Sequence, residues 1–372
     1  MAYTTIDDPS AHFQVHYWVG TSTGDGVAQT LGGNSDLQPD LVWHKHNGSS
    51  DHALFTSSLI ANDDANTSNT IPVSNRSQVP YNNSGDVDFS SFDSDGFTLD
   101  SSSQIDTATS NGVFTVNWCW KANGGTVASF SEVSNNPAGN RQVNTTAGFS
   151  IMTWTGTGVI DSGTSGTIAH GLGAVPHVIL VKCRSNAHDW CVYHHENTAA
   201  PETDFLILNE TTGTTDGTTH WNDTAHTSTN INLHDKGGTN RNDETHVGYV
   251  WTEIQGYSKF GRYTSNGVAN GTFVYLGFKP AFVMIKRTDA DGQWLMFDTK
   301  RSAYNPTLSW IPAEVTTAES SGKDIDILSN GFKARTTAGD INEGDSTTGV
   351  YVYVAFAEQP FVTSGGVPAT AR

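Results

Sequence analysis

The chain has 372 residues, of which 15% are charged and 37 are glycine, and its formal net charge is −19. Nucleic-acid binding needs a basic surface, and an anionic membrane repels an acidic protein, so both partners are disfavoured. No run approaches the ~18 apolar residues of a membrane span. The first residues lack the basic and apolar segments of a signal peptide. We therefore expect no nucleic-acid partner, no membrane insertion and no export by a signal peptide.

One pattern occurs three times along the chain: a proline, an apolar strand, and a lysine six residues after the proline. Proline is tolerated where a strand begins, because the missing N–H donor is not needed there. Lysine at the far end of the strand is expected to reach water through its flexible stem. We interpret these lysines as structural. The pairs are Pro39 with Lys45, Pro176 with Lys182, and Pro280 with Lys286.

Further elements recur around each pair. A short strand closing on glycine precedes the proline, and a turn follows the lysine and leads to a second strand, which together predict a hairpin. Trp190 and Trp294 open that second strand in two copies, whereas the first copy has His52-Ala-Leu-Phe55. A strongly alternating strand ends each copy. The strands closing on glycine are 13–20, 149–156 and 260–267, and the alternating strands are 113–120, 247–251 and 350–356.

These repeats predict an all-β chain of three tandem antiparallel β-sandwich domains, jelly-roll-like and related by internal repeat. Only 312–319 resembles a short helix. Copies two and three abut, which suggests a fixed angle between them and a separate first copy. The predicted boundaries are an N-terminal arm 1–12, copy one 13–122, a linker 123–148, copy two 149–258, copy three 259–361 and a loose C-terminal tail 362–372.

No metal site is predicted. The three cysteines are too few for a disulfide framework and fit buried thiols in a reducing cytoplasm. The pair His44 and His46 and the run His194-His195-Glu196 do not recur among the copies, so surface or turn histidines are the preferred interpretation. The acidic loops 93–96, 289–292 and 324–326 lack the full pattern of a calcium loop. We expect no cofactor and at most adventitious calcium.

No catalytic residue is predicted either. Nucleophile-elbow and phosphate-loop motifs are absent from the sequence, and no spacing selects a carboxylate pair of the kind that glycosidases use. The carboxylates considered are Glu196, Glu202, Asp298 and Glu358. If the chain were a carbohydrate-binding module, exposed aromatics such as Trp221 or Trp310 would stack on sugars. The ligand-binding residues are otherwise unknown from the sequence.

The chain resembles repetitive β-sandwich structural proteins of tailed phages, especially marine phages that infect cyanobacteria. The resemblance covers nearly the whole chain and is strongest in copies two and three. It implies a tail-fibre-like or appendage protein and implies no catalytic residues. The segments that carry it are 1–13, 147–151, 169–176, 253–260, 274–288 and 355–361.

The predicted function is therefore a non-enzymatic virion component, a fibre, appendage or surface protein for assembly and host attachment. The alternatives are a capsid decoration protein and a free, lectin-like carbohydrate-binding module. The expected partners are other virion proteins, further copies of the chain in a homo-oligomer such as a trimer, and a host glycan or receptor. The expected location is the virion, made in the bacterial cytoplasm and released by lysis. We expect the N-terminal part to anchor and copies two and three to project.

Overall fold

The computed structural model describes residues 3–20, 27–60, 70–81, 89–99, 112–159, 163–344 and 348–370. In these ranges the chain forms 25 strands, with one short α-helix, α1 (Ser57–Ile60), and two 3-10 turns, η1 (Pro9–Ala11) and η2 (Pro201–Thr203). All pairings between named strands are antiparallel. The all-β prediction is confirmed. No described helix is long and apolar enough to cross a bilayer.

Each copy contributes one main sheet with the same strand order: first strand, last strand, proline–lysine strand, hairpin strand. The shared order is the topological counterpart of the sequence repeat. In copy one these strands are β1 (Phe13–Val19), β7 (Phe114–Trp120), β3 (Leu41–His46) and β4 (Ala53–Thr56). In copy two they are β10 (Phe149–Thr155), β17 (Thr245–Trp251), β12 (Val178–Cys183) and β13 (Cys191–His194), continued by β14 (Asp204–Ile207) and β15 (Thr215–Asp216). In copy three they are β18 (Ser258–Thr264), β25 (Val350–Pro360), β20 (Phe278–Arg287) and β21 (Leu295–Asp298), continued by β22 (Ile311–Pro312).

A small sheet covers one face of each main sheet. Apolar side chains from both sheets form a separate buried cluster in each copy, so each copy has two packed layers. The small sheets are β2 (Val27–Thr30), β6 (Gly96–Leu99) and β5 (Phe89–Asp93); β11 (Gly166–Ala169) and β16 (Asn230–Leu233); and β19 (Phe273–Tyr275), β24 (Gly331–Ala334) and β23 (Ile325–Leu328).

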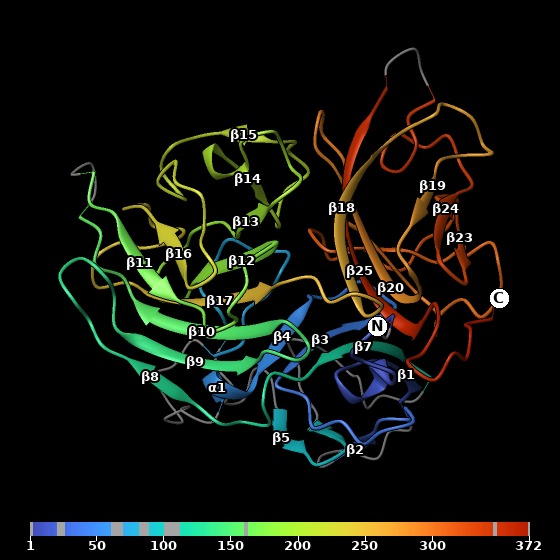
Figure 1. Ribbon diagram of the computed structural model, residues 1–372, viewed down its shortest axis with the longest axis horizontal. Helices are drawn as coiled ribbons and strands as arrows, with labels where there is room; N and C mark the ends of the chain where they lie inside the picture. The colour runs from blue at the N-terminus through green and yellow to red at the C-terminus, as the bar shows by residue number, and fades with distance from the viewer. Residues whose placement is uncertain are drawn as a thin grey trace.

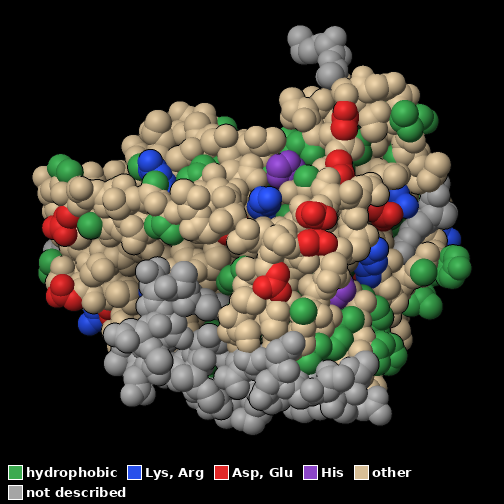
Figure 2. All heavy atoms as spheres, turned by 90° about the horizontal axis from the view of Figure 1, so that it is seen from below, with side chains coloured by type: hydrophobic (Ala, Val, Ile, Leu, Met, Phe, Trp, Pro, Cys, Tyr) green, Lys and Arg blue, Asp and Glu red, His purple; other side chains and the backbone are tan. Residues whose placement is uncertain are grey.

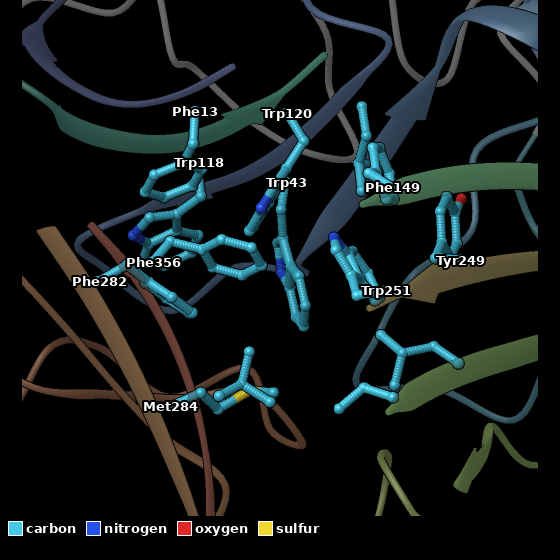
Figure 3. Packing of buried hydrophobic residues seen from close by; sticks show 14 of the residues in the cluster. Phe13, Trp43, Trp118, Trp120, Phe149, Tyr249, Trp251, Phe282, Met284 and Phe356 are labelled. Atoms are coloured by element: carbon cyan, nitrogen blue, oxygen red, sulfur yellow. The ribbon is translucent and has the colours of Figure 1, made fainter. Parts of the chain in front are cut away.

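The other faces of the three main sheets meet in one central core. Figure 1 shows the copies grouped around it, copy one in blue and teal, copy two in green and yellow, copy three in orange and red. The core is rich in aromatic residues from all three copies (Figure 3). Phe282 of copy three packs on Trp118 and Trp120 of copy one, and Trp120 packs on Trp251 of copy two. Because every copy supplies part of this core, copies two and three are not a pair set apart from copy one.

The segment 123–148, expected to be a linker, contains two strands, β8 (Ala128–Phe130) and β9 (Gly139–Asn144). β9 pairs along β10 from Phe149 to Trp154 and extends the main sheet of copy two. Its Gln142 is buried and lies within hydrogen-bond distance of Ser57 and Asp40 of copy one. This segment therefore fills the boundary between copies one and two. The sequence predicted a linker here because the polar composition of the segment is typical of a loop.

Three local predictions differ from the structure. The first strand of copy three begins at Ser258, so Phe260 matches Val15 rather than Phe13 in the pairing with the last strand. Pro280 lies inside β20, where the register shifts around it, because proline cannot donate to the ladder. The segment 312–319 is not helical: Pro312 pairs with Leu295, and turns and bends follow it.

The ends of the chain are packed together rather than loose. Ser364 donates its backbone N–H to Asp7 at 2.6 Å, and Val362 bridges Pro368. Thr4 donates its hydroxyl to the Gln255 carbonyl at 2.8 Å, where copies two and three join. The expectation of a loose C-terminal tail is wrong for the described residues up to 370, because the N-terminal arm provides acceptors for it.

Candidate functional site

The boundaries between copies carry the residues that the sequence repeat singled out. The indole of Trp190 in copy two donates to the Val73 carbonyl of copy one at 2.9 Å. The indole of Trp294 in copy three donates to the Ile207 carbonyl of copy two, also at 2.9 Å. Both tryptophans are almost fully buried. The matching tryptophans therefore join neighbouring copies as well as packing the core.

The repeated lysines are buried, which corrects the expectation that they reach water. Lys286 donates to the Thr211 carbonyl of copy two and to Gly292, both at 2.6 Å. Lys182 donates to the Ser77 carbonyl of copy one at 2.7 Å and to the carbonyl of His188. In an isolated sandwich domain this end of the strand would face water, but here the neighbouring copy covers it. Burial lowers the pKa of Lys182 and of Lys286 to about 8.

Different residues make the contacts at the boundary between copies one and three. Lys45 donates to its own loop, to the carbonyls of His46 and Gly48 at 2.8 and 2.5 Å and to the Ser50 hydroxyl at 3.1 Å. The Ser50 N–H then donates to the Thr316 carbonyl of copy three at 2.9 Å. Burial lowers the pKa of Lys45 to about 7.

His52 takes the place of the tryptophan at this boundary. It is fully buried and accepts the Trp43 indole N–H at 3.2 Å. Burial and the nearby charge of Lys45 hold the pKa of His52 well below its usual value. The Pro312 carbonyl of copy three has the opposite, smaller effect and raises this pKa. The three boundaries thus form a closed cycle: copy two onto one, three onto two, and one onto three.

A surface groove lies at the boundary of copies two and three, and we call it the junction groove. It has a volume of about 440 Å³. The first strand of copy three, β18, forms its floor, with β19 on one side and the end of the copy-two hairpin on the other. Its polar and aromatic lining comprises His195, Glu196, Glu253, Lys259, Phe260, Arg262, Tyr263, Phe273, Tyr275 and Tyr353.

Two exposed aromatic side chains line the junction groove. Phe273 is 45% and Tyr275 is 48% exposed, while Val274 between them is buried, as expected for alternate residues of one strand. The ammonium of Lys259 lies 5.6 Å from the centre of the Tyr275 ring and donates to the Tyr275 carbonyl at 3.2 Å. This contact orders the side of the groove on which Tyr275 lies.

Two carboxylates face the same groove. Glu253 accepts the Phe260 N–H at 2.7 Å, and burial raises the pKa of its carboxyl group. Burial raises the pKa of Tyr353 above its usual value, and the charges of Glu253 and Glu196 raise it further. Both carboxylates therefore influence the ionisation of the same side chain, the phenol of Tyr353. Aromatic faces next to carboxylates and Arg262 can stack on a sugar ring and bind its hydroxyl groups.

Side chains also cap the outer edge of β18. The ring of His195 contacts the Phe260 carbonyl at 2.7 Å, and Glu253 binds the N–H of the same residue. Side-chain caps of this kind prevent an edge strand from pairing with another chain. The groove is therefore suited to a ligand that uses side chains rather than to an added strand.

The positions that correspond to the junction groove at the other two boundaries have different surroundings. Between copies three and one, a groove of about 310 Å³ runs along β1 and is lined by His16, Tyr17, Lys300 and Glu358. Between copies one and two, β9 pairs with β10 and occupies the position. Among the described residues, two of the three boundaries thus carry a groove, and the junction groove is the one lined by Phe273 and Tyr275.

The sequence-selected sugar-stacking candidates are not at the surface. Trp221 is 0% and Trp310 is 8% exposed, so neither can stack on a ligand in solution. Trp221 packs on Tyr193 and His226, and Lys323 lies 4.3 Å from the Trp310 ring centre. Trp221 belongs to the buried cluster of copy two and Trp310 to that of copy three.

The histidines that invited a metal interpretation make structural contacts. His44 bonds Asn117 at 2.7 Å and, like His46, is buried. His194 bonds the Tyr353 carbonyl at 3.1 Å, across the boundary with copy three. Burial lowers the pKa of His44 to about 4 and that of His194 to about 3. The rings of His44 and His194 are therefore neutral near pH 7 and make structural contacts.

Several carboxylates of the acidic loops and of the sequence candidates are held by protein groups. Asp298 is buried in an ion pair with Arg301 at 2.5 Å. Asp289 pairs with Arg287 at 3.0 Å. Asp93 accepts the hydroxyls of Ser91 and Thr98. Of the carboxylates considered from sequence, only Glu196 lies in the junction groove, beside Glu253; Glu202 and Asp298 do not line it, and Glu358 lines the groove along β1.

A family model described as a domain of unknown function, DUF7483, matches residues 8–360, and the chain belongs to this family. The match spans all three copies, so the family unit is the closed ring rather than a single sandwich. No curated protein and no solved structure matches the chain.

Sequence reasoning missed the groove residues. Phe273 and Tyr275 directly precede the Leu276-Gly277 element of the repeat, and they flank a single buried valine. Exposed aromatics on a short strand are a usable signal. The sequence could not show that the copy-two hairpin end would lie opposite them.

Proposed function

We propose that this protein is a non-enzymatic structural component of a tailed-phage virion, a fibre, appendage or surface protein that contributes to assembly and host attachment. The observation that carries the proposal is the closed ring. Three copies share one aromatic core and join through buried indole and ammonium groups. A particle exposed outside a cell benefits from a body that resists local opening.

The fold supports a finer proposal as well. The copies are three jelly-roll-like sandwich domains that diverged from one unit and closed on each other within a single chain. The common strand order and the matching boundary contacts support this origin. Contacts with virion proteins and with further copies of the chain, such as those in a trimer, belong to the same proposal.

The junction groove is the proposed attachment surface, with a host glycan as its ligand. Its exposed Phe273 and Tyr275 supply stacking faces, and Glu196, Glu253 and Arg262 supply polar contacts. The formal net charge of −19 disfavours a polyanionic ligand, and on the face in Figure 2 the described lysines and arginines are scattered among other side chains. Many weak sites on one particle gain avidity through copy number.

The first test is to locate the chain. Particles are purified and analysed by mass spectrometry, and antibody-labelled particles are imaged by electron microscopy. The proposal predicts the chain in stoichiometric amounts on the tail or on the capsid surface. A capsid location would select the decoration-protein alternative. Absence from purified particles would contradict the virion role.

The second test concerns the groove. Binding of the purified chain to a panel of host surface glycans is compared with that of Tyr275→Ala, and we expect a loss of about tenfold, the value of one stacking contact. The matched control is Tyr304→Ala, since Tyr304 is 84% exposed and lies outside the groove. Equal losses in both variants would reject the groove as the ligand site. Glycan binding without a particle would favour the free lectin-like module.

A further inference from the structure

A second site of chemical interest lies in copy two, on the side of the boundary with copy one. Cys183 ends β12, His188 lies in the loop of the hairpin, and Glu244 directly precedes β17. Their sulfur, nitrogen and oxygen atoms all lie within 4.8 Å of one another. In the described part of the chain no other group of three such residues comes together in this way.

The atoms of this cluster face each other without a complete set of hydrogen bonds. Glu244 Oε2 lies 3.4 Å from Cys183 Sγ, which donates to it, and 3.1 Å from His188 Nε2. His188 Nε2 is buried and yet is not aligned for a hydrogen bond. A buried ring nitrogen that lies within ion-pair distance of a carboxylate oxygen but makes no hydrogen bond is an arrangement that a shared cation would satisfy.

The surrounding residues hold these side chains in place. Glu244 Oε1 accepts from the Asn186 amide at 2.9 Å and lies 3.4 Å from Arg241 Nε, which leaves Oε2 facing the other two residues. The His188 ring lies against Gly237, where a Cβ would come within 2.2 Å of it. Lys182 binds the backbone carbonyl of His188. Such outer contacts orient the ligands in metal sites.

We propose that Cys183, His188 and Glu244 bind a zinc-type divalent ion. A thiolate, an imidazole and a carboxylate are the donors that Zn²⁺ takes in proteins, and tetrahedral coordination separates such atoms by about 3.3–3.7 Å. The distances of 3.4 and 3.1 Å from Glu244 Oε2 require shifts of a few tenths of an ångström, and the sulfur of Cys183 and the ring nitrogen of His188, which lie within 4.8 Å of each other, would approach by up to about 1.2 Å. Binding would release the thiol proton of Cys183 to solvent, as metal binding to cysteine does.

A surface cavity lies beside the cluster, and of the three proposed ligands His188 lines it. His188, Gly237 and Arg241 line a surface cavity of about 380 Å³, from which water can reach the ion. The ion would fix the loop that carries His188. That loop is also held by Lys182, whose ammonium bonds Ser77 of copy one. The site therefore couples metal binding to the boundary between copies one and two.

The test uses the purified full chain, stripped with a chelator and titrated with Co²⁺ and then Zn²⁺. We expect one equivalent of Co²⁺ to bind with the near-ultraviolet charge-transfer band of a thiolate ligand, and Zn²⁺ to displace it. Cys183→Ala is expected to abolish the band and to weaken Zn²⁺ binding by at least about 100-fold. Cys119→Ala is the matched control, because Cys119 is also a buried free thiol but lies in copy one.

A second variant guards against misfolding. Glu244→Gln keeps the size and an oxygen for the Asn186 contact but removes the charge, and we expect a weaker affinity with an unchanged circular dichroism spectrum. The proposal is overturned if no equivalent of Co²⁺ binds with a thiolate band, or if the band survives Cys183→Ala. Equal affinity of Glu244→Gln and the wild type would remove the carboxylate from the ligand set.

Discussion

Two boundaries of the ring perform the same task with different side chains. At the boundary of copies three and two, Trp294 donates to the Ile207 carbonyl, and Lys286 bonds Thr211 across the boundary. At the boundary of copies one and three, His52 replaces the tryptophan, and Lys45 bonds its own loop instead. At the first boundary the indole and the ammonium bond the neighbouring copy directly, whereas at the second the Ser50 N–H bonds the Thr316 carbonyl and Lys45 remains within its own copy.

This difference shows that equivalent positions of the repeat can carry chemically different side chains and still join the copies into the same ring. A tryptophan supplies buried area that does not depend on pH. A buried neutral histidine supplies a contact that exists only while its proton is absent. We therefore expect the two boundaries to respond differently to truncation and to acid, and three predictions test that expectation.

The largest expected effect is that of Trp294→Ala. Truncating a buried tryptophan costs about 3–5 kcal/mol through lost burial and the cavity left behind, and the Ile207 carbonyl also loses its donor. Equilibrium unfolding in urea measures the loss. His52→Ala is the comparison, with an expected loss of about 1–3 kcal/mol. Equal losses would show that the two boundaries do not differ as described.

A smaller loss is expected for Lys286→Met. Methionine fills the space of the stem but leaves the carbonyls of Thr211 and Gly292 without their donor, which costs about 1–3 kcal/mol. Lys300→Met is the control, because Lys300 is exposed. The prediction fails if Lys286→Met is as stable as the wild type, since the buried ammonium would then contribute nothing to the boundary.

The smallest effect concerns acid and His52. Its pKa is lowered in the folded state, so below pH ~6.5 the unfolded state binds a proton that the folded state does not, and stability falls as pH falls. In His52→Gln this contribution is absent. We expect the free energy of unfolding of this variant to fall less steeply with decreasing pH than that of the wild type, by up to about 1.4 kcal/mol per pH unit.

Urea unfolding of the wild type and His52→Gln at several pH values from about 7 to about 5 gives the two slopes. Trp294→Phe serves as the control, because it changes the other boundary without changing a titratable group. The same slope in His52→Gln and the wild type would contradict a neutral buried histidine at this boundary.

The sequence predicted the elements of this fold better than their assembly. The proline–lysine strand, the hairpin and the alternating last strand appear where the repeat places them. Burial of Lys182 and Lys286 was not predictable from one copy, because each binds a carbonyl of a neighbouring copy. Burial of Lys45 was not predictable either, because the hairpin loop that it binds contacts copy three. The strand β9 was missed for a related reason: its polar residues pair with β10 and do not form a core.

The sites were predictable to a smaller extent. Glu196 and the hairpin cysteines were noticed, but their partners Glu253, Tyr275 and Glu244 come from segments that only the fold brings near. A spacing of five residues between Cys183 and His188 is a weak signal by itself. The third donor, Glu244, directly precedes β17, the strand with which β12 pairs, and lies 61 residues after Cys183.

The central claim is that the three copies form one interlocked ring, and native-state hydrogen exchange of the wild type and Trp294→Ala tests it most directly. The account predicts that the slowest amides of all three main sheets exchange through one common opening, and that Trp294→Ala lowers its free energy in copies one and two as well as in copy three. Separate opening energies for the three copies, with Trp294→Ala changing only copy three, would contradict the ring.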